Sequence, residues 1–452
     1  MSEHRIDRER LAALARREAE RFTTTHPKSA ELASQARPHL LSGVPMHWMS
    51  DWGTPFSLFV SSAAGNRLVD VDGHEYLDFC LGDTGAMFGH SPAPVAAAIA
   101  QHATGGYTTM LPSPDAARVG ALLAERFGLP VWQVCTSATD ANRFVIRWAR
   151  ALTDRDKILV FDGCYHGTAD DTLVRLHGGD TVPRPGLVGQ VNDLAAHTVV
   201  AEFNDLAGVE ALLARGDVAA VLTEPALTNI GMVLPEPGFI EGLRALTERY
   251  DTLLILDETH TISAGWGGWS GELRVVPDLL TLGKPVAGGL PAAVFGMSRA
   301  VAERAEAFLA QKEAGHSGMG TTLSANLFTL AAMRANLESV MTPNAYATMQ
   351  DTAAYLAERL TALFDQHRLP WCVTQIGARC EFQFCAERPR TGREAEAAMD
   401  HELEAALHLY LLNRGVLITP FHNMTLCAPD TRRSDVDRLV DALGEALVEL
   451  AD

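Results

Sequence analysis

"TLLILDETHTISAGWGGW" (residues 252–269) and "LLTLGKPVAGGLPAAVFG" (residues 279–296) are the two stretches that decide the fold of this chain. Each begins with a short apolar run, and the runs lead to Asp257 and Lys284, respectively. Apolar runs of this length, bounded by polar or glycine residues, predict buried strands. A carboxylate at the exit of a buried strand is costly without a partner, so we expect a cation or hydrogen-bond donors close to Asp257.

Five further apolar runs accompany these two between residues 112 and 338, and helix-length amphipathic segments such as 138–152 separate several of them. This alternation predicts an α/β fold with a mostly parallel central sheet and helices on both faces. In such sheets the chemistry lies at the carboxyl ends of the strands. The seven runs are VWQVCTS (131–137), KILVFDG (157–163), HTVVAEF (197–203), VAAVLTEP (218–225), TLLILDE (252–258), LLTLGK (279–284) and AAVFGMS (292–298).

The two ends of the chain follow other patterns. We expect a charged helix at the start, a second helix within 29–44, and a β-hairpin within 66–79 that turns at Asp72-Gly73. A long helix (344–369), a strand pair (372–385) and a final helix (432–452) are expected after the sheet. We therefore predict three segments: 1–111 and 339–452, which form a smaller α+β domain, and the large domain 112–338.

The composition indicates a globular protein that acts on small molecules. A chain of 452 residues with 47% hydrophobic content can bury a large core. The net charge of −19 argues against nucleic acid as a partner. The charged start has no signal-peptide pattern, and no apolar stretch is long enough to span a bilayer, so we expect a cytoplasmic protein without a membrane partner. The seven cysteines are scattered without a C-x-x-C pair, so we expect reduced thiols and no metal.

Lys284 has the surroundings of a nucleophile. It follows an apolar run and precedes Gly288 and Gly289, which let a ligand approach the backbone. Desolvation favours the neutral amine of such a lysine, which can condense with a carbonyl. A P-loop hydrolase would also place an acid after an apolar run, but that class needs G-x-x-x-x-G-K-[ST], and Pro285 follows Lys284.

A third feature lies where a strand leads into a helix. Ser137, Ala138 and Thr139 would place N–H groups and hydroxyls at the helix start, which suits a phosphate, although such residues are more often an ordinary helix cap. A phosphate site, an acid that protonates a ring nitrogen and a lysine for an aldehyde together specify pyridoxal 5'-phosphate.

Six ordered motifs resemble those of the class III (subgroup II) aminotransferases of pyridoxal-phosphate fold type I. Within that family the chain is most similar to the branch of glutamate-1-semialdehyde aminomutases and β-amino-acid aminotransferases. The motifs are TSATDA (136–141), FDGCYHG (161–167), TEPALTNIG (223–231), LDETHT (256–261), LGKPVAGGLP (282–291) and TTLSAN (321–326).

The resemblance implies roles for these residues. Lys284 would form the Schiff base and shuttle protons, and Asp257 would pair with the pyridinium nitrogen. Tyr165 would stack on the ring, and Thr322 would reach the phosphate from the neighbouring subunit of a homodimer with shared sites. The other implied cofactor contacts are Ser137, Ala138, Thr139, His166, Glu224 and Asn229.

The substrate side departs from the family pattern. The arginine expected after the N-terminal turn is absent from "SGVPMHWMSDW" (42–52), and those expected near the C-terminal strand and after the Asp-Glu pair are also absent. Arginine binds a carboxylate through two parallel hydrogen bonds, so we expect a pocket that suits a less acidic substrate. The candidate lining residues are His47, Trp48, His260, Phe421 and His422, while Arg379 remains a candidate carboxylate anchor. The loop 177–190 either folds over the pocket or is an inert surface loop.

These features favour a pyridoxal-phosphate aminotransferase that moves an amino group between an amine or amino acid and a carbonyl acceptor. An isomerase of the same fold, an aminomutase or a racemase, is the first alternative, because one lysine can return the proton or amino group within one substrate. A ligand-binding protein without catalytic activity is disfavoured, since both Lys284 and Asp257 are present.

Overall fold

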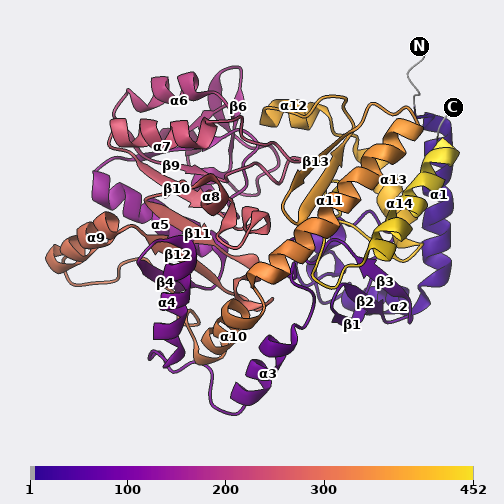
Figure 1. The fold of residues 1–452 in the computed structure, drawn as a ribbon, viewed down its shortest axis with the longest axis horizontal. Helices are drawn as coiled ribbons and strands as arrows, with labels where there is room; N and C mark the ends of the chain where they lie inside the picture. Colours follow the sequence, from indigo (N-terminus) through magenta and orange to yellow (C-terminus); the bar gives the residue numbers. More distant parts are fainter. Residues whose placement is uncertain (1–5, 451–452) are drawn as a thin grey trace. The chain divides into compact units, whose positions relative to one another are not determined.

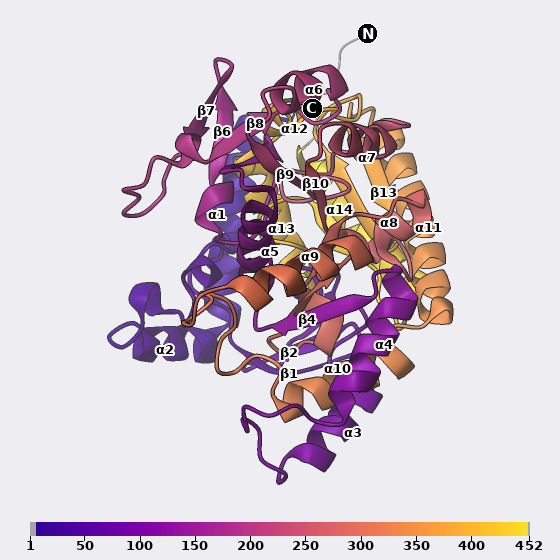
Figure 2. The ribbon, with the colours of Figure 1, turned by 90° about the vertical axis from the view of Figure 1, so that its left-hand side faces the viewer.

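The structure is a computed structural model that describes residues 6–450. Its contacts define two compact units: a small unit (Met1–Pro92, Asn344–Arg388 and Ala398–Asp452) and a large unit (Ala93–Pro343 and Pro389–Ala397). Helix α3 (Ala93–His102) groups with the large unit because it packs on α10 (Leu327–Ser339), as Figure 2 shows. The predicted domain boundaries at 111 and 338 stay predictions, and the expected helix at residues 1–5 lies outside the described residues.

A seven-stranded mixed sheet forms the centre of the large unit, in the order β4-β12-β11-β10-β9-β5-β8 (Figure 1). Strand β12 runs antiparallel to both of its neighbours, and every other pair is parallel. All seven predicted strands are confirmed. They are β4 (Val131–Cys135), β5 (Lys157–Phe161), β8 (Thr198–Ala201), β9 (Val218–Thr223), β10 (Leu253–Asp257), β11 (Leu279–Leu282) and β12 (Ala293–Met297).

Both faces of this sheet are covered, as the apolar runs predict. Every residue of β9 and β10 is buried, and successive strand side chains point to opposite faces. Helix α5 (Ala138–Thr153) contributes Phe144, Val145 and Ile146 to the same core as the strands. The other helices of the large unit are α4 (Asp115–Phe127), α6 (Leu206–Leu213), α7 (Phe239–Arg249), α8 (Gly268–Leu273), α9 (Arg299–Gln311) and α12 (Gly392–Ala397).

The predicted loop 177–190 is in part a hairpin, so that expectation was wrong for its first half. Strands β6 (Val174–His177) and β7 (Asp180–Pro183) pair antiparallel. Gly178 and Gly179 form the turn with φ of 61° and 92°. Two positive φ values are what a two-residue hairpin turn of the favoured hand requires, and glycine adopts them without strain. The Gly-Gly pair was the available sequence signal.

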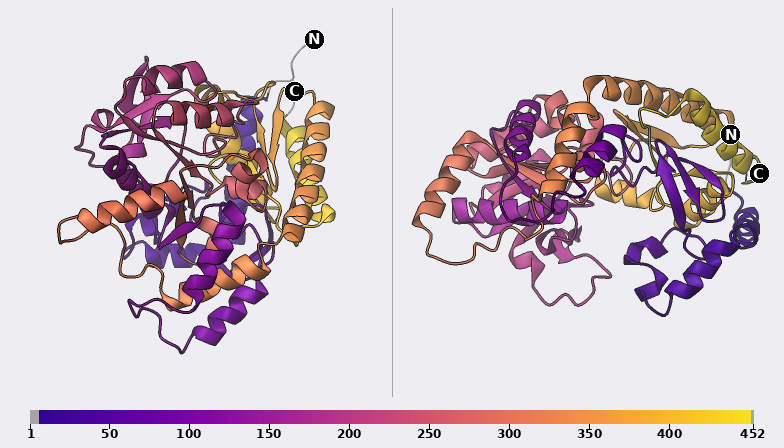
Figure 3. Two further views of the ribbon diagram at one scale, coloured as in Figure 1. Left: turned by 60° about the vertical axis from the view of Figure 1, so that its left-hand side comes forward. Right: turned by 90° about the horizontal axis from the view of Figure 1, so that it is seen from below.

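The small unit contains two sheets and five α-helices among the described residues. Its sheets have the orders β1-β2-β3-β15 and β13-β14-β16, and the predicted hairpin and strand pair are β2–β3 and β13–β14. Figures 1 and 3 show α11 and α14 side by side, in orange and yellow. The elements are β1 (Val60–Ala64), β2 (Arg67–Asp70), β3 (Glu75–Asp78), β13 (Cys372–Ile376), β14 (Arg379–Gln383), β15 (Val416–Leu417), β16 (Met424–Leu426), α1 (Arg8–Thr25), α2 (Pro27–Ala36), α11 (Pro343–Gln366), α13 (His401–Leu412) and α14 (Arg433–Leu450).

Two further sequence expectations concern helices and cysteines. Within residues 6–450, no helix has both the length and the apolar composition that crossing a bilayer demands.

All seven cysteines are free thiols, and five are buried. The sulfurs of Cys372 and Cys385 lie 3.8 Å apart without a bond, and the reduced state of the thiols stays a prediction.

Candidate active site

Asp257 is the last residue of β10 and has 2% of its surface exposed. Its Oδ2 accepts hydrogen bonds from Asn142 Nδ2 at 2.8 Å and from His166 Nδ1 at 2.9 Å. Its Oδ1 accepts the backbone N–H of Thr259 at 3.1 Å. A buried carboxylate without such partners would be strongly destabilising. The partners that the sequence required are therefore present, and they fix the orientation of the carboxylate.

Asp257 and His166 form a buried ion pair. Burial by itself would raise the pKa of Asp257, but the hydrogen bond and charge of His166, together with Thr259 and Asn142, bring it to about 2. Burial would likewise lower the pKa of His166, but the neighbouring Cys164 and Asp257 outweigh it and raise that pKa to about 10. At neutral pH the pair is a carboxylate and an imidazolium, so His166 Nδ1 is the donor.

Lys284 follows β11 at the neighbouring strand end. Strands β10 and β11 are parallel with Asp257 opposite Thr281, so both residues leave the sheet at the same edge. The half-buried Lys284 has a φ of 42°, an uncommon value for a residue with a side chain. Its Nζ lies 2.9 Å from Nε2 of the buried His260. His260, predicted to line the substrate pocket, thus contacts the amine of the lysine.

The predicted anion site lies at the start of α5, as the sequence placed it. Ser137 is the helix cap, and its Oγ accepts the N–H of Asp140 at 3.2 Å. Thr139 Oγ1 accepts the N–H of Thr168 at 3.1 Å. The first-turn N–H groups of an α-helix have no partner within the helix and are available to a phosphate. Ser137, Ala138 and Thr139 lie half-buried at this end.

Glu224 connects two other predicted residues. It is buried, and its carboxylate accepts the backbone N–H of Tyr165 at 3.2 Å and the hydroxyl of Thr228. Burial raises the pKa of Glu224 to about 7, although His166 and Thr228 partly offset this rise. Asn229 Nδ2 lies 3.5 Å from Thr228 Oγ1. Tyr165 is 39% exposed, so its ring is accessible for stacking.

Thr322 is exposed in a segment beside the α5 start of its own chain. The hydroxyls of Thr321 and Ser324, on either side of it, lie 3.0 Å and 3.1 Å from Thr136 Oγ1. Thr136 directly precedes Ser137. The segment therefore contacts this region within one chain, while contact with a neighbouring subunit stays a prediction.

Trp48 and Phe421, two of the predicted substrate residues, form an aromatic pair in the small unit. Their ring centroids lie 5.6 Å apart with the ring planes at 81°, an edge-to-face contact. Both rings are substantially exposed, and His47, next to Trp48, is exposed as well. An accessible apolar surface of this kind suits the apolar body of a ligand.

The other two predicted residues of the small unit are buried. His422 Nδ1 lies 2.8 Å from Glu381 Oε1. Burial disfavours the charged imidazole, but the charge and hydrogen bond of Glu381 raise the pKa of His422 above its usual value. Arg379 has no exposed surface and donates from Nη2 to the hydroxyl of Thr84. Both side chains therefore have protein partners, and contact with substrate stays a prediction for each.

Sequence reasoning missed Asn142, which holds Asp257 from α5. The residue is fully buried, and its Oδ1 accepts the hydroxyl of Thr281 at 2.8 Å. The available signal was an amide on an apolar helix face, where it lies with Val145 and Ile146. A polar side chain at such a position requires a hydrogen-bond partner.

These residues fit pyridoxal phosphate. Asp257 is ionised, and its Oδ1 accepts the N–H of Thr259, whereas a carboxylate oxygen can accept two hydrogen bonds. A ring N–H can therefore bind there. Lys284 would supply the amine, and the start of α5 would supply donors for the phosphate. Beside them, a Cβ on Gly283 would lie 2.8 Å from Ala138 Cβ, so the lysine segment and the α5 start are closely packed.

Comparisons with known proteins show the family of the chain. Residues 48–447 match the class-III aminotransferase family. The chain is 33% identical over 431 residues to glutamate-1-semialdehyde 2,1-aminomutase 2 of Brevibacillus brevis, covering 93% of this chain and 98% of that protein. It superposes with a TM-score of 0.96 on a glutamate-1-semialdehyde-aminomutase from Pseudomonas aeruginosa PAO1, at 51% identity and 98% and 99% coverage.

A β-phenylalanine aminotransferase from Variovorax paradoxus is also similar, with a TM-score of 0.85, 27% identity, and coverage of 96% of this chain and 97% of that one. The P. aeruginosa protein has also been solved as a variant in complex with PMP. The chain therefore belongs to the class III aminotransferase family of pyridoxal-phosphate enzymes with fold type I.

Proposed function

We propose that this enzyme is an isomerase of the aminomutase kind, which moves an amino group between carbons of one substrate. The observation that carries the proposal is 51% identity, over 98% of the chain, to a protein described as a glutamate-1-semialdehyde-aminomutase. The curated relative from B. brevis has the same description. The sequence features favoured an aminotransferase first, and these relatives support the alternative better.

Pyridoxal phosphate, when bound, supplies an aldehyde that condenses with amines and a ring that accepts electrons from the substrate Cα–H bond. Asp257 would hold a proton on the ring nitrogen, because its carboxylate stays ionised beside the His166 imidazolium. The α5 start would bind the phosphate. Lys284 would move the proton at the substrate carbon as general base and then general acid.

His260 would assist Lys284 in that role. The 2.9 Å contact between Lys284 Nζ and His260 Nε2 lets a neutral imidazole accept a hydrogen bond from the amine and orient it. His260 is buried, so bulk water does not replace it in this contact. An amine held in one position can both take a proton from the substrate and return it. Movement of the amino group within one substrate requires both transfers.

An aminotransferase remains the second candidate, and a specific observation favours it. The exposed Trp48–Phe421 pair and the missing arginine in residues 42–52 suit an amine with an apolar body. The β-phenylalanine aminotransferase of V. paradoxus has an aromatic substrate by its name. Glutamate 1-semialdehyde carries a carboxylate, and Arg379 is the predicted anchor for one.

The test is turnover without an acceptor. The cofactor-loaded enzyme is given glutamate 1-semialdehyde alone, and loss of substrate is counted per active site, with Lys284→Ala as the inactive control. Many turnovers without a keto acid support the isomerase. A stop after one equivalent, with turnover resuming when a keto acid is added, overturns it in favour of the aminotransferase.

Substrate choice is tested with three further donors: 1-phenylethylamine, a β-amino acid and an α-amino acid, each with a keto acid. We expect glutamate 1-semialdehyde to be consumed faster than any of them. If it is not consumed under either condition while 1-phenylethylamine turns over with a keto acid, the aminomutase proposal fails and a non-carboxylate amine is the substrate class.

A further inference from the structure

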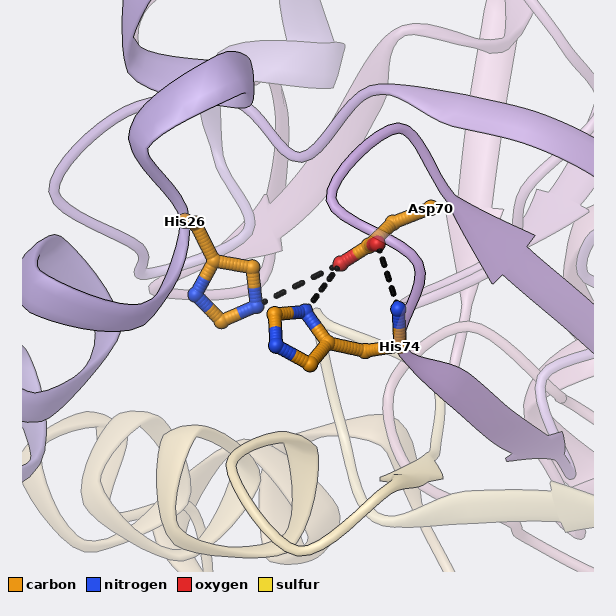
Figure 4. Close-up of side chains that lie close together, drawn as sticks. All are labelled: His26, Asp70 and His74. Carbon is orange, nitrogen blue, oxygen red and sulfur yellow. Dashed lines mark hydrogen bonds and ion pairs between the residues drawn. The ribbon is translucent and has the colours of Figure 1, made fainter.

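Two histidines and an aspartate gather in the small unit (Figure 4). His26 lies between α1 and α2, Asp70 ends β2, and His74 follows the turn of the β2–β3 hairpin. Asp70 Oδ2 lies 2.8 Å from His74 Nδ1 and 3.5 Å from His26 Nε2. One ligand atom from each of the three residues lies within 4.8 Å of the others. His26 and Asp70 are buried, and His74 is half-buried.

We infer that His26, Asp70 and His74 bind a zinc ion. Two imidazoles and a carboxylate are a donor set that zinc takes in proteins. With metal–ligand bonds of about 2.0–2.1 Å, tetrahedral geometry puts neighbouring donors about 3.3 Å apart. The separations of 2.8 Å and 3.5 Å lie on either side of that value, so an ion fits after small side-chain movements.

The surroundings of His26 select the tautomer that a metal needs. Its Nδ1 lies 2.8 Å from the backbone carbonyl oxygen of Phe22, which can only accept, so Nδ1 carries the hydrogen. In the neutral ring Nε2 then carries a lone pair, and this atom lies 2.8 Å from the Tyr76 hydroxyl and 3.5 Å from Asp70 Oδ2. A backbone carbonyl that fixes the other ring nitrogen is the usual partner of a metal-binding histidine.

The Asp70 carboxylate is fixed in the same way. Its Oδ1 accepts the backbone N–H groups of Gly73 at 2.7 Å and His74 at 2.8 Å. These bonds hold Oδ2 toward the two imidazoles. The negatively charged oxygen of a carboxylate in this position is the natural ligand of a cation, and the supporting N–H groups remain in place whether or not an ion binds.

The Tyr76 hydroxyl contacts two of the proposed ligand atoms. The Tyr76 hydroxyl lies 2.8 Å from both His26 Nε2 and Asp70 Oδ2, and both of these atoms are acceptors in the tautomer above. Without an ion, the one hydrogen of the hydroxyl can go to His26 Nε2, because His74 Nδ1 lies 2.8 Å from Asp70 Oδ2 and can donate to it. A zinc ion bound to Nε2 and Oδ2 would replace both of these hydrogen bonds, and the hydroxyl would then donate to the carboxylate.

The proposed site joins segments that are distant in sequence. It would tie the α1–α2 junction to the β2–β3 hairpin, where Asp72 already accepts the N–H groups of Lys28 and Ser29. The side chain of His74 is 42% exposed, which gives the ion a route from solvent and room for water as a further ligand. None of the three residues belongs to the pyridoxal-phosphate site, so the expected role is structural.

The experiment compares zinc binding by the full-length holoenzyme and by variants. After removal of metals with a chelator, each protein is titrated with Zn²⁺ against a coloured competing chelator. His74→Ala removes one proposed ligand at a half-exposed position. His39→Ala removes an exposed histidine of the same unit and serves as the matched control.

We expect the wild type and His39→Ala to bind one equivalent tightly, and His74→Ala and Asp70→Asn to bind it at least ~10-fold more weakly. Zn²⁺ should also raise the melting temperature of the first two proteins but not of His74→Ala. Co²⁺ should give the visible spectrum of an ion bound to nitrogen and oxygen when it is added to the wild type. The same addition to His74→Ala should not give this spectrum. Equal zinc binding by His74→Ala and wild type, or no tight binding by the wild type, would overturn the inference.

Discussion

Asp257 and His166 are both charged and almost fully buried. A charged residue is rarely buried in a protein core without a partner. The arrangement is tolerated because each charge is the partner of the other and because Asn142 and Thr259 also donate hydrogen bonds to the carboxylate of Asp257. Removing one partner would leave the other charge buried and unpaired. The same pairing keeps Asp257 ionised, as its proposed role beside the cofactor ring requires.

This ion pair predicts a pH dependence of stability. The pKa of folded His166, about 10, lies above its ordinary 6.5, so its contribution is complete below pH 6.5 and is lost as the pH rises toward 10. The pKa of Asp257, about 2, lies below its ordinary 3.8, so its contribution is complete above pH 3.8 and is lost as the pH falls toward 2. Stability from the pair is thus greatest between pH 3.8 and 6.5.

We expect His166→Asn to lower the free energy of unfolding at pH 6 and to flatten its decline between pH 7 and 10. Urea unfolding of the cofactor-free protein at several pH values measures both effects. His197→Asn, at an exposed position of the same unit, should follow the wild type. Parallel pH curves for His166→Asn and the wild type would show that the imidazolium does not contribute.

At the scale of elements, the site depends on the close approach of the β11 exit to the start of α5. Gly283 has no side chain, and a Cβ there would meet Ala138 Cβ at 2.8 Å and Ala138 N at 3.4 Å. The backbone of Gly283 needs no positive φ, so the requirement is one of space alone. Lys284 and the helix start are therefore held in one fixed relation.

Gly283→Ala should push these two elements apart. We expect at least ~10-fold weaker binding of pyridoxal phosphate and a loss of about 1–3 kcal/mol in stability from overpacking. Cofactor titration followed by absorbance, together with urea unfolding, measures the two effects. Gly120→Ala is the control, because a Cβ in this part of α4 meets no atom within 4 Å, and alanine favours a helix. Unchanged cofactor affinity in Gly283→Ala would refute this account of the spacing.

At the scale of the whole molecule, the open question is whether one chain makes a complete site. The family resemblance predicts a homodimer in which Thr322 reaches the neighbouring phosphate. In the structure, Thr321 and Ser324 contact Thr136 of the same chain. These two arrangements differ in which subunit completes the phosphate site.

Hybrid dimers distinguish them. Consider a dimer of one Lys284→Ala and one Thr322→Ala subunit. If each site takes its Thr322 from the neighbouring subunit, one of the two sites has both native residues. If each site is built from a single chain, both sites lack one native residue. The two variants are mixed in equal amounts and allowed to exchange subunits. Random pairing makes about half of the dimers hybrids, and each hybrid has one intact site out of two. We therefore expect about a quarter of wild-type activity at limiting cofactor. Activity equal to the mean of the two parent variants would exclude sharing.

Most of the secondary structure was predictable because its signals are local. The seven runs of the central sheet, the Asp72-Gly73 hairpin and the long helix from Asn344 are all present. The β6–β7 hairpin was missed because its strands are short and half-exposed, and its Gly-Gly turn was taken as loop composition. The partners of each site residue were less predictable, since no local pattern relates Asn142 or His166 to Asp257.

The sequence by itself determined the sheet and the presence of an acid and a lysine at its strand ends, because strand burial and strand exits follow from apolar runs and their boundaries. Only the tertiary structure decided that Asn142 and His166 hold Asp257, that His260 contacts Lys284, and that His26 lies beside Asp70 and His74. These pairings join residues 24 to 115 positions apart. They depend on how helices and hairpins pack, and packing is a property of the whole set of side chains rather than of any one stretch.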